Sequence, residues 1–103
     1  MQKTYRGDRT IDGIKVTVDG QPLPERTDIK AISQDGFEWS YAGTAPAQLA
    51  LAILIDHSGS TQKALRLYEP FMKQVVANFD NEWELTSADV EDAVHVLENA
   101  QHP

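Results

Sequence analysis

The sequence predicts an α+β fold in which a small N-terminal antiparallel sheet of about three strands packs on three C-terminal helices. Residues 14–18 and 37–41 alternate apolar and polar side chains, as half-buried strands do. The second half of the chain instead spaces its apolar residues with a helical period and contains one segment, 44–55, that is apolar all round. We expect residues 1–103 to form a single domain, because a chain of this length fits one hydrophobic core.

The apolar segment 44–55, TAPAQLALAILI, is the expected centre of the fold. A helix without a polar face must be buried on most sides. At about 12 residues it is too short to span a bilayer, so we expect protein to cover it. Thr44 is the predicted N-cap, and Gly59 fits the end of the helix.

The strands are predicted from alternation and from turn residues. Residues 4–6 have a β-compatible composition and are closed by Gly7 and Asp8, and residues 14–18 follow an Asp-Gly turn. Residues 37–41 give the clearest strand signal, with three aromatic side chains on one face. We expect this row in the core rather than as a stacking platform for bases, because such platforms sit in basic grooves and this chain is acidic.

Two further helices are predicted after the central one. A helix over residues 62–79 carries an apolar stripe, and Pro70 in its middle predicts a kink or two shorter helices. Residues 80–85 are expected to form a loop, and Thr86 to cap the last helix. The expected stripe of the first of these helices is Leu65, Tyr68, Met72, Val75, Val76 and Phe79, widened by Leu67 and Phe71. The expected core face of the second is Val90, Ala93, Val94 and Leu97.

Negative charge gathers at the C-terminal end of the chain. The formal net charge is −7, and no Lys or Arg occurs from Asp80 onward. Such a surface repels nucleic-acid phosphates and attracts a basic protein surface. The other interpretation is a solvated helix face that keeps the protein in solution. The predicted partner-binding residues are Glu82, Glu84, Asp89, Glu91, Asp92 and Glu98.

No pattern that carries chemistry is present, so the sequence predicts no enzyme, no cofactor and no metal site. Nucleophile-elbow and phosphate-binding glycine patterns are both missing. Asp56 and His57 are the remaining catalytic candidates, and a general base would need a pocket and a nucleophile beside it. Glu91 and His95 lie one turn apart and would need further metal ligands. The lack of cysteine, of a signal-like N-terminus and of a long apolar span predicts a cytoplasmic protein away from membranes.

One long stretch resembles a known family. It is GFEWSYAGTAPAQLALAILIDHSGSTQKALRLYEPFMKQVV, together with the opening KTYRGDR and the pattern V-x-V-D-G-x-P-L. These residues are similar to a family of small uncharacterised proteins of bacteria, archaea and their phages and mobile elements. The resemblance covers residues 3–76 and continues loosely to the last helix. It implies a common fold, but no activity and no functional residues. Pro70 departs from the family pattern, in which that helix is uninterrupted.

The leading hypothesis is a non-enzymatic acidic binding protein. It would be a phage or mobile-element inhibitor or modulator that docks on a basic, nucleic-acid-binding surface of a host protein, such as a defence nuclease complex, without contacting nucleic acid directly. The alternative is a structural or assembly module that forms a homo-oligomer through its aromatic strand or its kinked helix.

Overall fold

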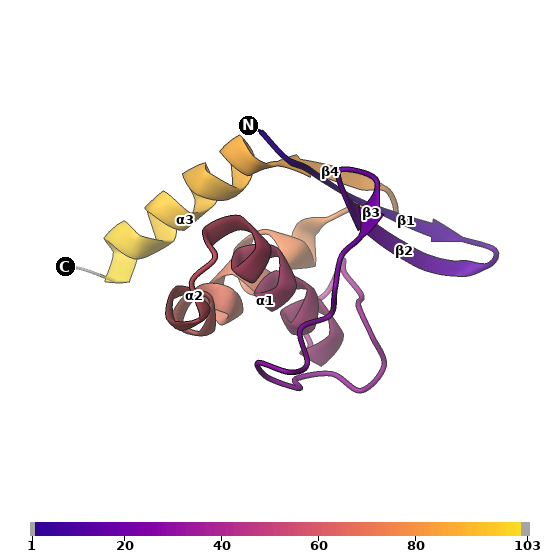
Figure 1. Ribbon diagram of the computed structural model, residues 1–103, viewed down its shortest axis with the longest axis horizontal. Coiled ribbons are helices and arrows are strands. Elements are labelled where there is room, and N and C mark those ends of the chain that lie inside the picture. Colours follow the sequence, from indigo (N-terminus) through magenta and orange to yellow (C-terminus); the bar gives the residue numbers. More distant parts are fainter. Residues whose placement is uncertain (1, 102–103) are drawn as a thin grey trace.

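The computed structural model, which describes residues 2–101, has the predicted α+β architecture (Figure 1). An antiparallel sheet of order β3-β2-β1-β4 lies to one side of the helices. The strands are β1 (Thr4–Thr10), β2 (Gly13–Val18), β3 (Gln21–Pro22) and β4 (Trp83–Thr86). The helices are α1 (Thr44–Ser58), α2 (Thr61–Gln74), the short 3-10 helix η1 (Val76–Asn78) and α3 (Ser87–Gln101).

Strand β1 lies in the middle of the sheet and is longer than predicted. Gly7 and Asp8 do not close it, because β1 continues in register with β2 as far as the pair Thr10 and Gly13. Gly7 belongs in the strand for a packing reason. The indole of Trp83 covers the position that a Cβ would occupy there, so the close approach requires glycine.

The predicted strand over residues 37–41 is wrong, and its place in the sheet is taken by β4. Ser40 has a φ of 78°, in the left-handed region, which breaks the extended backbone. Its N–H donates to the carbonyl of Val76 at 3.1 Å, so the segment bonds to η1 instead of to a strand. As a result the aromatic row is divided, with Trp39 buried in the core and Tyr41 exposed.

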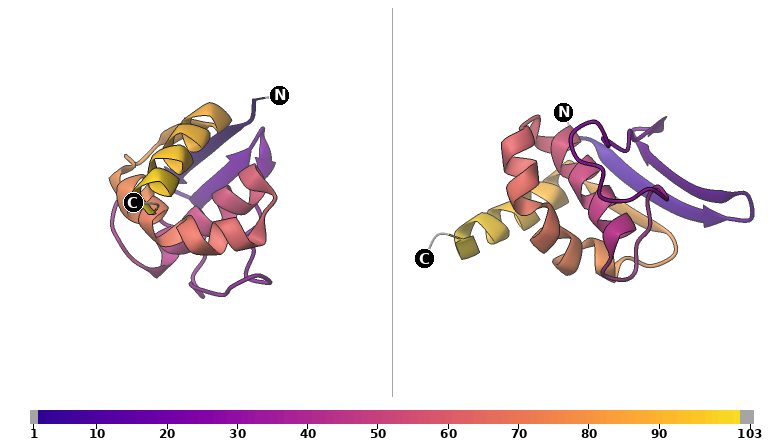
Figure 2. Two further views of the ribbon diagram at one scale, coloured as in Figure 1. Left: turned by 90° about the vertical axis from the view of Figure 1, so that its left-hand side faces the viewer. Right: turned by 90° about the horizontal axis from the view of Figure 1, so that it is seen from below.

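Helix α1 is buried along its length, as its composition predicts, and packs most extensively on α2 (Figure 2). Thr44 is not the N-cap, because Gly43 occupies that position and Thr44 is already helical. Gly59 ends the helix in the left-handed conformation, and its N–H donates to Ile55 O at 2.8 Å.

Gln48 is the one fully buried polar side chain of α1, and it fastens the loop that precedes the helix. Its Oε1 accepts from the backbone N–H groups of Ile32 and Ser33, at 2.8 and 3.1 Å. Its Nε2 donates to the carbonyls of Glu25 and Lys30, at 2.7 and 3.1 Å. A buried amide is stable only when it is hydrogen-bonded in this way, and here it holds the loop around α1.

Helix α2 ends earlier than predicted, and its buried face contains only part of the predicted stripe. Pro70 lies inside one continuous helix, and the change to η1 comes at Val75 instead. Leu67, Phe71 and Met72 are buried as predicted, whereas Leu65 is exposed. The buried face of α2 consists of Ala64, Leu67, Phe71 and Met72.

Candidate partner-binding surface

The six carboxylates of the predicted partner-binding set are divided between two elements. Glu82 lies just before β4, and Glu84 lies in it. The other four lie on α3, which begins where β4 ends. Five of the six are exposed, and Glu98 is half-buried. The structure also gives several of them partners within the chain, which sequence reasoning did not anticipate.

Glu84 pairs with Arg6 across the sheet. The two residues are opposite each other in the β1–β4 register, and Glu84 Oε1 lies 2.7 Å from Arg6 Nε. Both side chains are more than half exposed. A pair of this kind stabilises a protein by about 0–1 kcal/mol, so a cation of a partner can exchange for Arg6 at little cost.

Asp89 belongs to the start of α3. Its Oδ2 accepts from the N–H of Thr86 at 3.0 Å, and its own N–H donates to Thr86 Oγ1 at 3.1 Å. This reciprocal arrangement is a capping box, with Asp in the position usually held by Glu, and it confirms Thr86 as the predicted cap. Asp89 therefore has a role in the fold whether or not it also meets a partner.

Glu91 and Glu98 fasten α3 to the two other helices. Glu91 Oε2 lies 2.6 Å from His57 Nε2 at the end of α1, and this hydrogen bond lowers the pKa of the Glu91 carboxyl below its usual range. Glu98 lies 3.2 Å from both Lys63 Nζ and Arg66 Nη2 of α2. Both carboxylates remain reachable from solvent, because Glu91 is 60% exposed and Glu98 is 30% exposed.

Glu82 and Asp92 differ from the other four. Within residues 2–101 neither side chain takes part in a salt bridge or a side-chain hydrogen bond. They are the members of the set whose charge the fold does not use. If the surface binds a basic partner, these two carboxylates can do so without the loss of an ion pair or a side-chain hydrogen bond among residues 2–101.

Asp56 and His57 are neighbours in sequence but point to different partners. Asp56 Oδ2 accepts from the hydroxyl of buried Tyr5 at 2.8 Å and lies 3.1 Å from Lys3 Nζ, whereas His57 contacts Glu91. Burial, followed by the hydrogen bond to Asp56, raises the pKa of Tyr5 far above its usual range. The hollow beside Asp56 is about 40 Å³ and is not lined by His57. The two side chains are therefore separated, and each is engaged within the fold.

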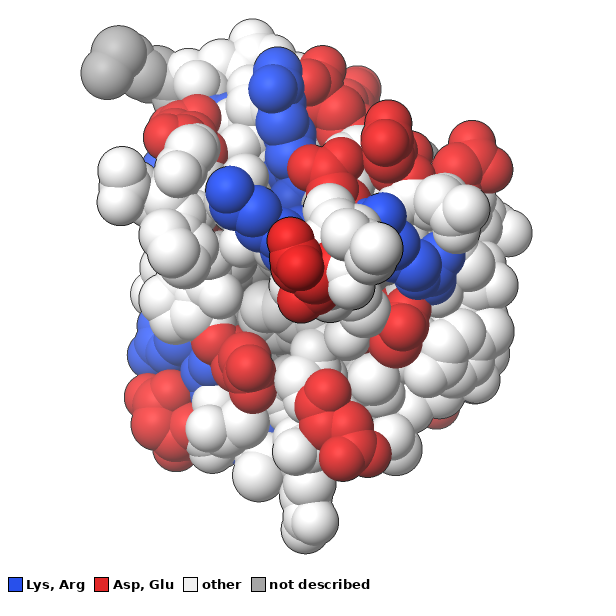
Figure 3. Space-filling model, turned by 90° about the vertical axis from the view of Figure 1, so that its right-hand side faces the viewer, with Lys and Arg blue, Asp and Glu red and all other residues white. Residues whose placement is uncertain are grey.

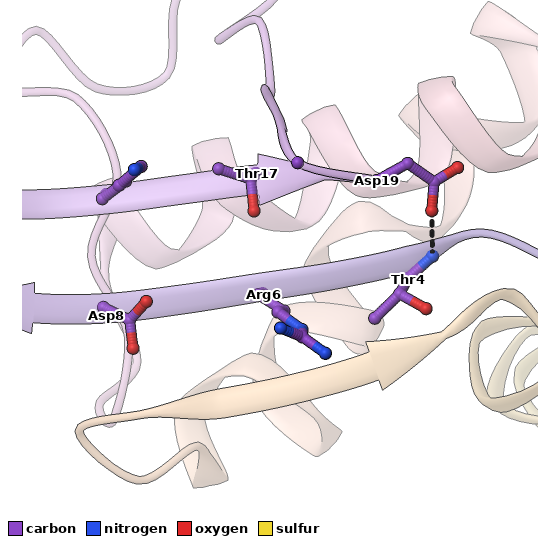
Figure 4. A pocket seen from close by; sticks show the side chains of 7 residues that line it. Thr4, Arg6, Asp8, Thr17 and Asp19 are labelled. Atoms are coloured by element: carbon purple, nitrogen blue, oxygen red, sulfur yellow. Dashed lines mark hydrogen bonds between the residues drawn. The ribbon is translucent and has the colours of Figure 1, made fainter.

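The outer face of the sheet carries a polar hollow of about 410 Å³ that sequence reasoning missed (Figure 4). It is lined by alternate residues of β1 and β2, and Thr4 N donates to Asp19 Oδ1 at its end, at 2.8 Å. Seen from the hairpin end, basic and acidic side chains are interleaved on this side of the molecule (Figure 3). The sequence signal for this face is the alternation of the polar residues Thr4, Arg6 and Asp8. Gly7, between Arg6 and Asp8, obscures that alternation.

Metal-binding clusters and membrane-spanning helices are both absent from residues 2–101. No group of three or more His, Asp or Glu side chains in this part of the chain is placed to hold a metal ion. Likewise, none of the helices that the structure describes combines the length and the apolar character needed to cross a membrane.

Comparison with known proteins identifies the family. Residues 5–96 match the model of a family described as "Family of unknown function (DUF6166)". The chain belongs to this family. The DUF6166 match runs from β1 to α3 and so includes β4 and most of α3, where the resemblance from the sequence was only loose. Neither the curated proteins nor the solved structures contain a match.

Proposed function

We propose that this member of the DUF6166 family is a non-enzymatic binding protein whose acidic surface docks on a basic surface of another protein. The observation that supports the proposal is the charge of the segment from β4 to α3. The chain contains no Lys or Arg from Asp80 onward. Glu82 and Asp92 are exposed and belong to none of the ion pairs within residues 2–101.

The partner that fits this surface is one that binds nucleic acid. Its basic groove is built for phosphates, and carboxylates can stand in the same places. The resemblance to proteins of phages and mobile elements suggests an inhibitor or modulator of a host machine, such as a defence nuclease complex. The protein would occupy the groove itself and would make no direct contact with nucleic acid.

The test is capture of a partner by the tagged protein from a lysate of the cells in which it occurs, with nuclease present and at low and high salt. The decisive variant is Glu82→Lys with Asp92→Lys, because neither change breaks a contact within the described chain. A matched control is Asp12→Lys with Glu69→Lys, which alters the net charge equally on exposed residues outside the surface. We expect the control to capture the partner and the decisive variant to lose it.

Two results would overturn the proposal. One is capture of the same partner by wild type and by the Glu82 and Asp92 variant alike. The other is the absence of any partner together with an oligomer in light scattering, which would favour the alternative of an assembly module. The observation that favours that alternative is Ile11, which is fully exposed at the tip of the β1–β2 hairpin.

A further inference from the structure

Strand β2 has an open edge near the hairpin tip. On the side away from β1, the two residues of β3 pair only with Thr17 and Val18, and the N–H of Leu23 extends the contact to Val16 O at 3.1 Å. Figure 1 shows the β1–β2 hairpin projecting beyond this short strand. The stretch 13–15 therefore has a neighbouring strand on one side only within the described residues.

The backbone of Ile14 faces this open edge. Hydrogen-bonding direction alternates along an antiparallel strand, so Ile14 points its N–H and C=O to the same side as Val16, away from β1. No backbone hydrogen bond reaches Ile14 from that side within the part of the chain that the structure describes. An unpaired edge is a template for one more strand. At and beyond β3, the edge is formed by residues that include Pro22 and Pro24, which have no backbone N–H to offer an added strand. An added strand can therefore pair with β2 only near the hairpin end.

A hollow of about 420 Å³ runs beside this edge. Its apolar part is formed by Ile14, which is 39% exposed, by buried Val16 and by half-buried Phe37 from the loop opposite. Glu25 and Asp35 line the same hollow, and both are exposed. Neither carboxylate belongs to an ion pair within residues 2–101.

These features specify the occupant. An added strand offers side chains to the hollow at every second residue. The apolar part suits an aliphatic side chain, and the two carboxylates suit a lysine or an arginine two residues away, whose side chain lies on the same face of the added strand. A second copy of this chain suits the site less well, because pairing two such edges would bring four carboxylates together.

We propose that the edge of β2 at Ile14 binds an extended segment of a partner protein in which an aliphatic residue and a basic residue stand two positions apart. The segment adds to the sheet as a strand beside β2, with main-chain hydrogen bonds to Ile14. An aliphatic side chain enters the hollow between Ile14 and Phe37, and a basic side chain meets Glu25 and Asp35. This site lies on a different part of the molecule from the acidic surface of β4 and α3 and does not depend on it.

The test is an NMR titration of the isotope-labelled protein with two synthetic octapeptides. In each, valine and lysine take turns at every second position with threonine between them, and one peptide has valine first and the other lysine first. We expect saturable shifts of the amide signals of residues 13–16 and 35–37. Ile14→Pro should weaken binding about tenfold or more, because it removes the N–H that faces the edge. It should not unfold the sheet, because that N–H makes no bond to β1.

A second variant keeps the test decisive if Ile14→Pro does not fold. Glu25→Gln with Asp35→Asn should lower the affinity several-fold and reduce its dependence on salt, whereas Asp12→Asn with Glu69→Gln should not. No saturable shift with either peptide, shifts confined to other residues, or equal binding by the folded variants would overturn the proposal. So would a dimer of the wild type that Ile14→Pro dissociates, since the edge would then bind a second copy.

Discussion

At the scale of single residues, Tyr5 and Asp56 show how a side chain at a helix end can be structural. The C-terminal end of α1 disfavours a negative charge, yet Asp56 lies there. The hydroxyl of Tyr5 and the ammonium group of Lys3 both contact Asp56 Oδ2, so the charge is hydrogen-bonded and partly neutralised. Because Tyr5 is completely buried, its hydroxyl requires such an acceptor. This pair has a sufficient explanation in folding alone.

Gly7 gives a prediction at the same scale. In an ordinary strand, Gly→Ala stabilises, because glycine loses more conformational freedom on folding. Here a Cβ would collide with the indole of Trp83, so we expect Gly7→Ala to lower the free energy of unfolding by about 1–3 kcal/mol. Urea unfolding measures the change. In the background of Trp83→Phe, whose ring is smaller, the same substitution should cost less; an equal cost would show that Trp83 is not the obstacle.

At the scale of elements, the contact between His57 and Glu91 predicts a pH dependence. The pKa of Glu91 is lowered in the fold, so this group adds stability above its usual pKa of 4.5 and loses it as the pH falls through the lower value. The contribution is less than about 1 kcal/mol, because Glu91 is exposed. When the pH is lowered from about 5.5 to about 3, the free energy of unfolding should fall less for the Glu91→Gln variant than for wild type.

A control for this effect is Asp92→Asn, the neighbouring carboxylate without a partner among the described residues. On acidification, the free energy of unfolding of this variant should fall by as much as that of wild type. If Glu91→Gln lost as much as wild type over the same range, the contact with His57 would not be the source of the dependence.

The elements were predictable where one local signal decided them. The apolar run of α1, the alternation in β2 and the Thr86 cap of α3 each identified an element correctly. Segment 37–41 failed because its alternation is that of a strand, while the left-handed Ser40 and its bond to η1 depend on tertiary contacts. Strand β4 was missed because its four residues are recognisable only beside β1.

The candidate surface was predictable in composition but not in pairing. Counting charges located the carboxylates of β4 and α3. It could not show that Arg6, from the other end of the chain, lies opposite Glu84, or that His57 reaches Glu91. The hollow beside Ile14 could not be predicted from the sequence either, because it forms between β2 and the loop around Phe37.

At the scale of the whole molecule, Arg9 joins three segments that are distant in sequence. Its guanidinium donates to Glu38 Oε1 and to Trp39 O, both at 2.7 Å from Nη2, and to Asn81 Oδ1 at 2.6 Å from Nη1. The same group lies 4.7 Å from the centre of the Trp39 ring. One side chain thus holds together the hairpin, the loop before α1 and the loop before β4.

We therefore expect Arg9→Lys to lower the free energy of unfolding by about 1–3 kcal/mol, since an ammonium group cannot reproduce the planar fork of donors. Amide hydrogen exchange should accelerate in segments 36–43 and 79–82 together. Arg6→Lys is the matched control, because Arg6 makes an exposed ion pair with Glu84, and its cost should stay below about 1 kcal/mol. Equal costs for the two variants would contradict the joining role of Arg9.

The central position of β1 has a consequence for synthesis. A ribosome releases β1 before any helix, yet one of the two neighbours of β1 is β4, which emerges after α2. Until residues 83–86 leave the exit tunnel, the nascent chain has an uncovered strand edge and lacks the indole that packs on Gly7. Contacts between such distant segments form late, so we expect this protein to complete its sheet only after α1 and α2 have been synthesised.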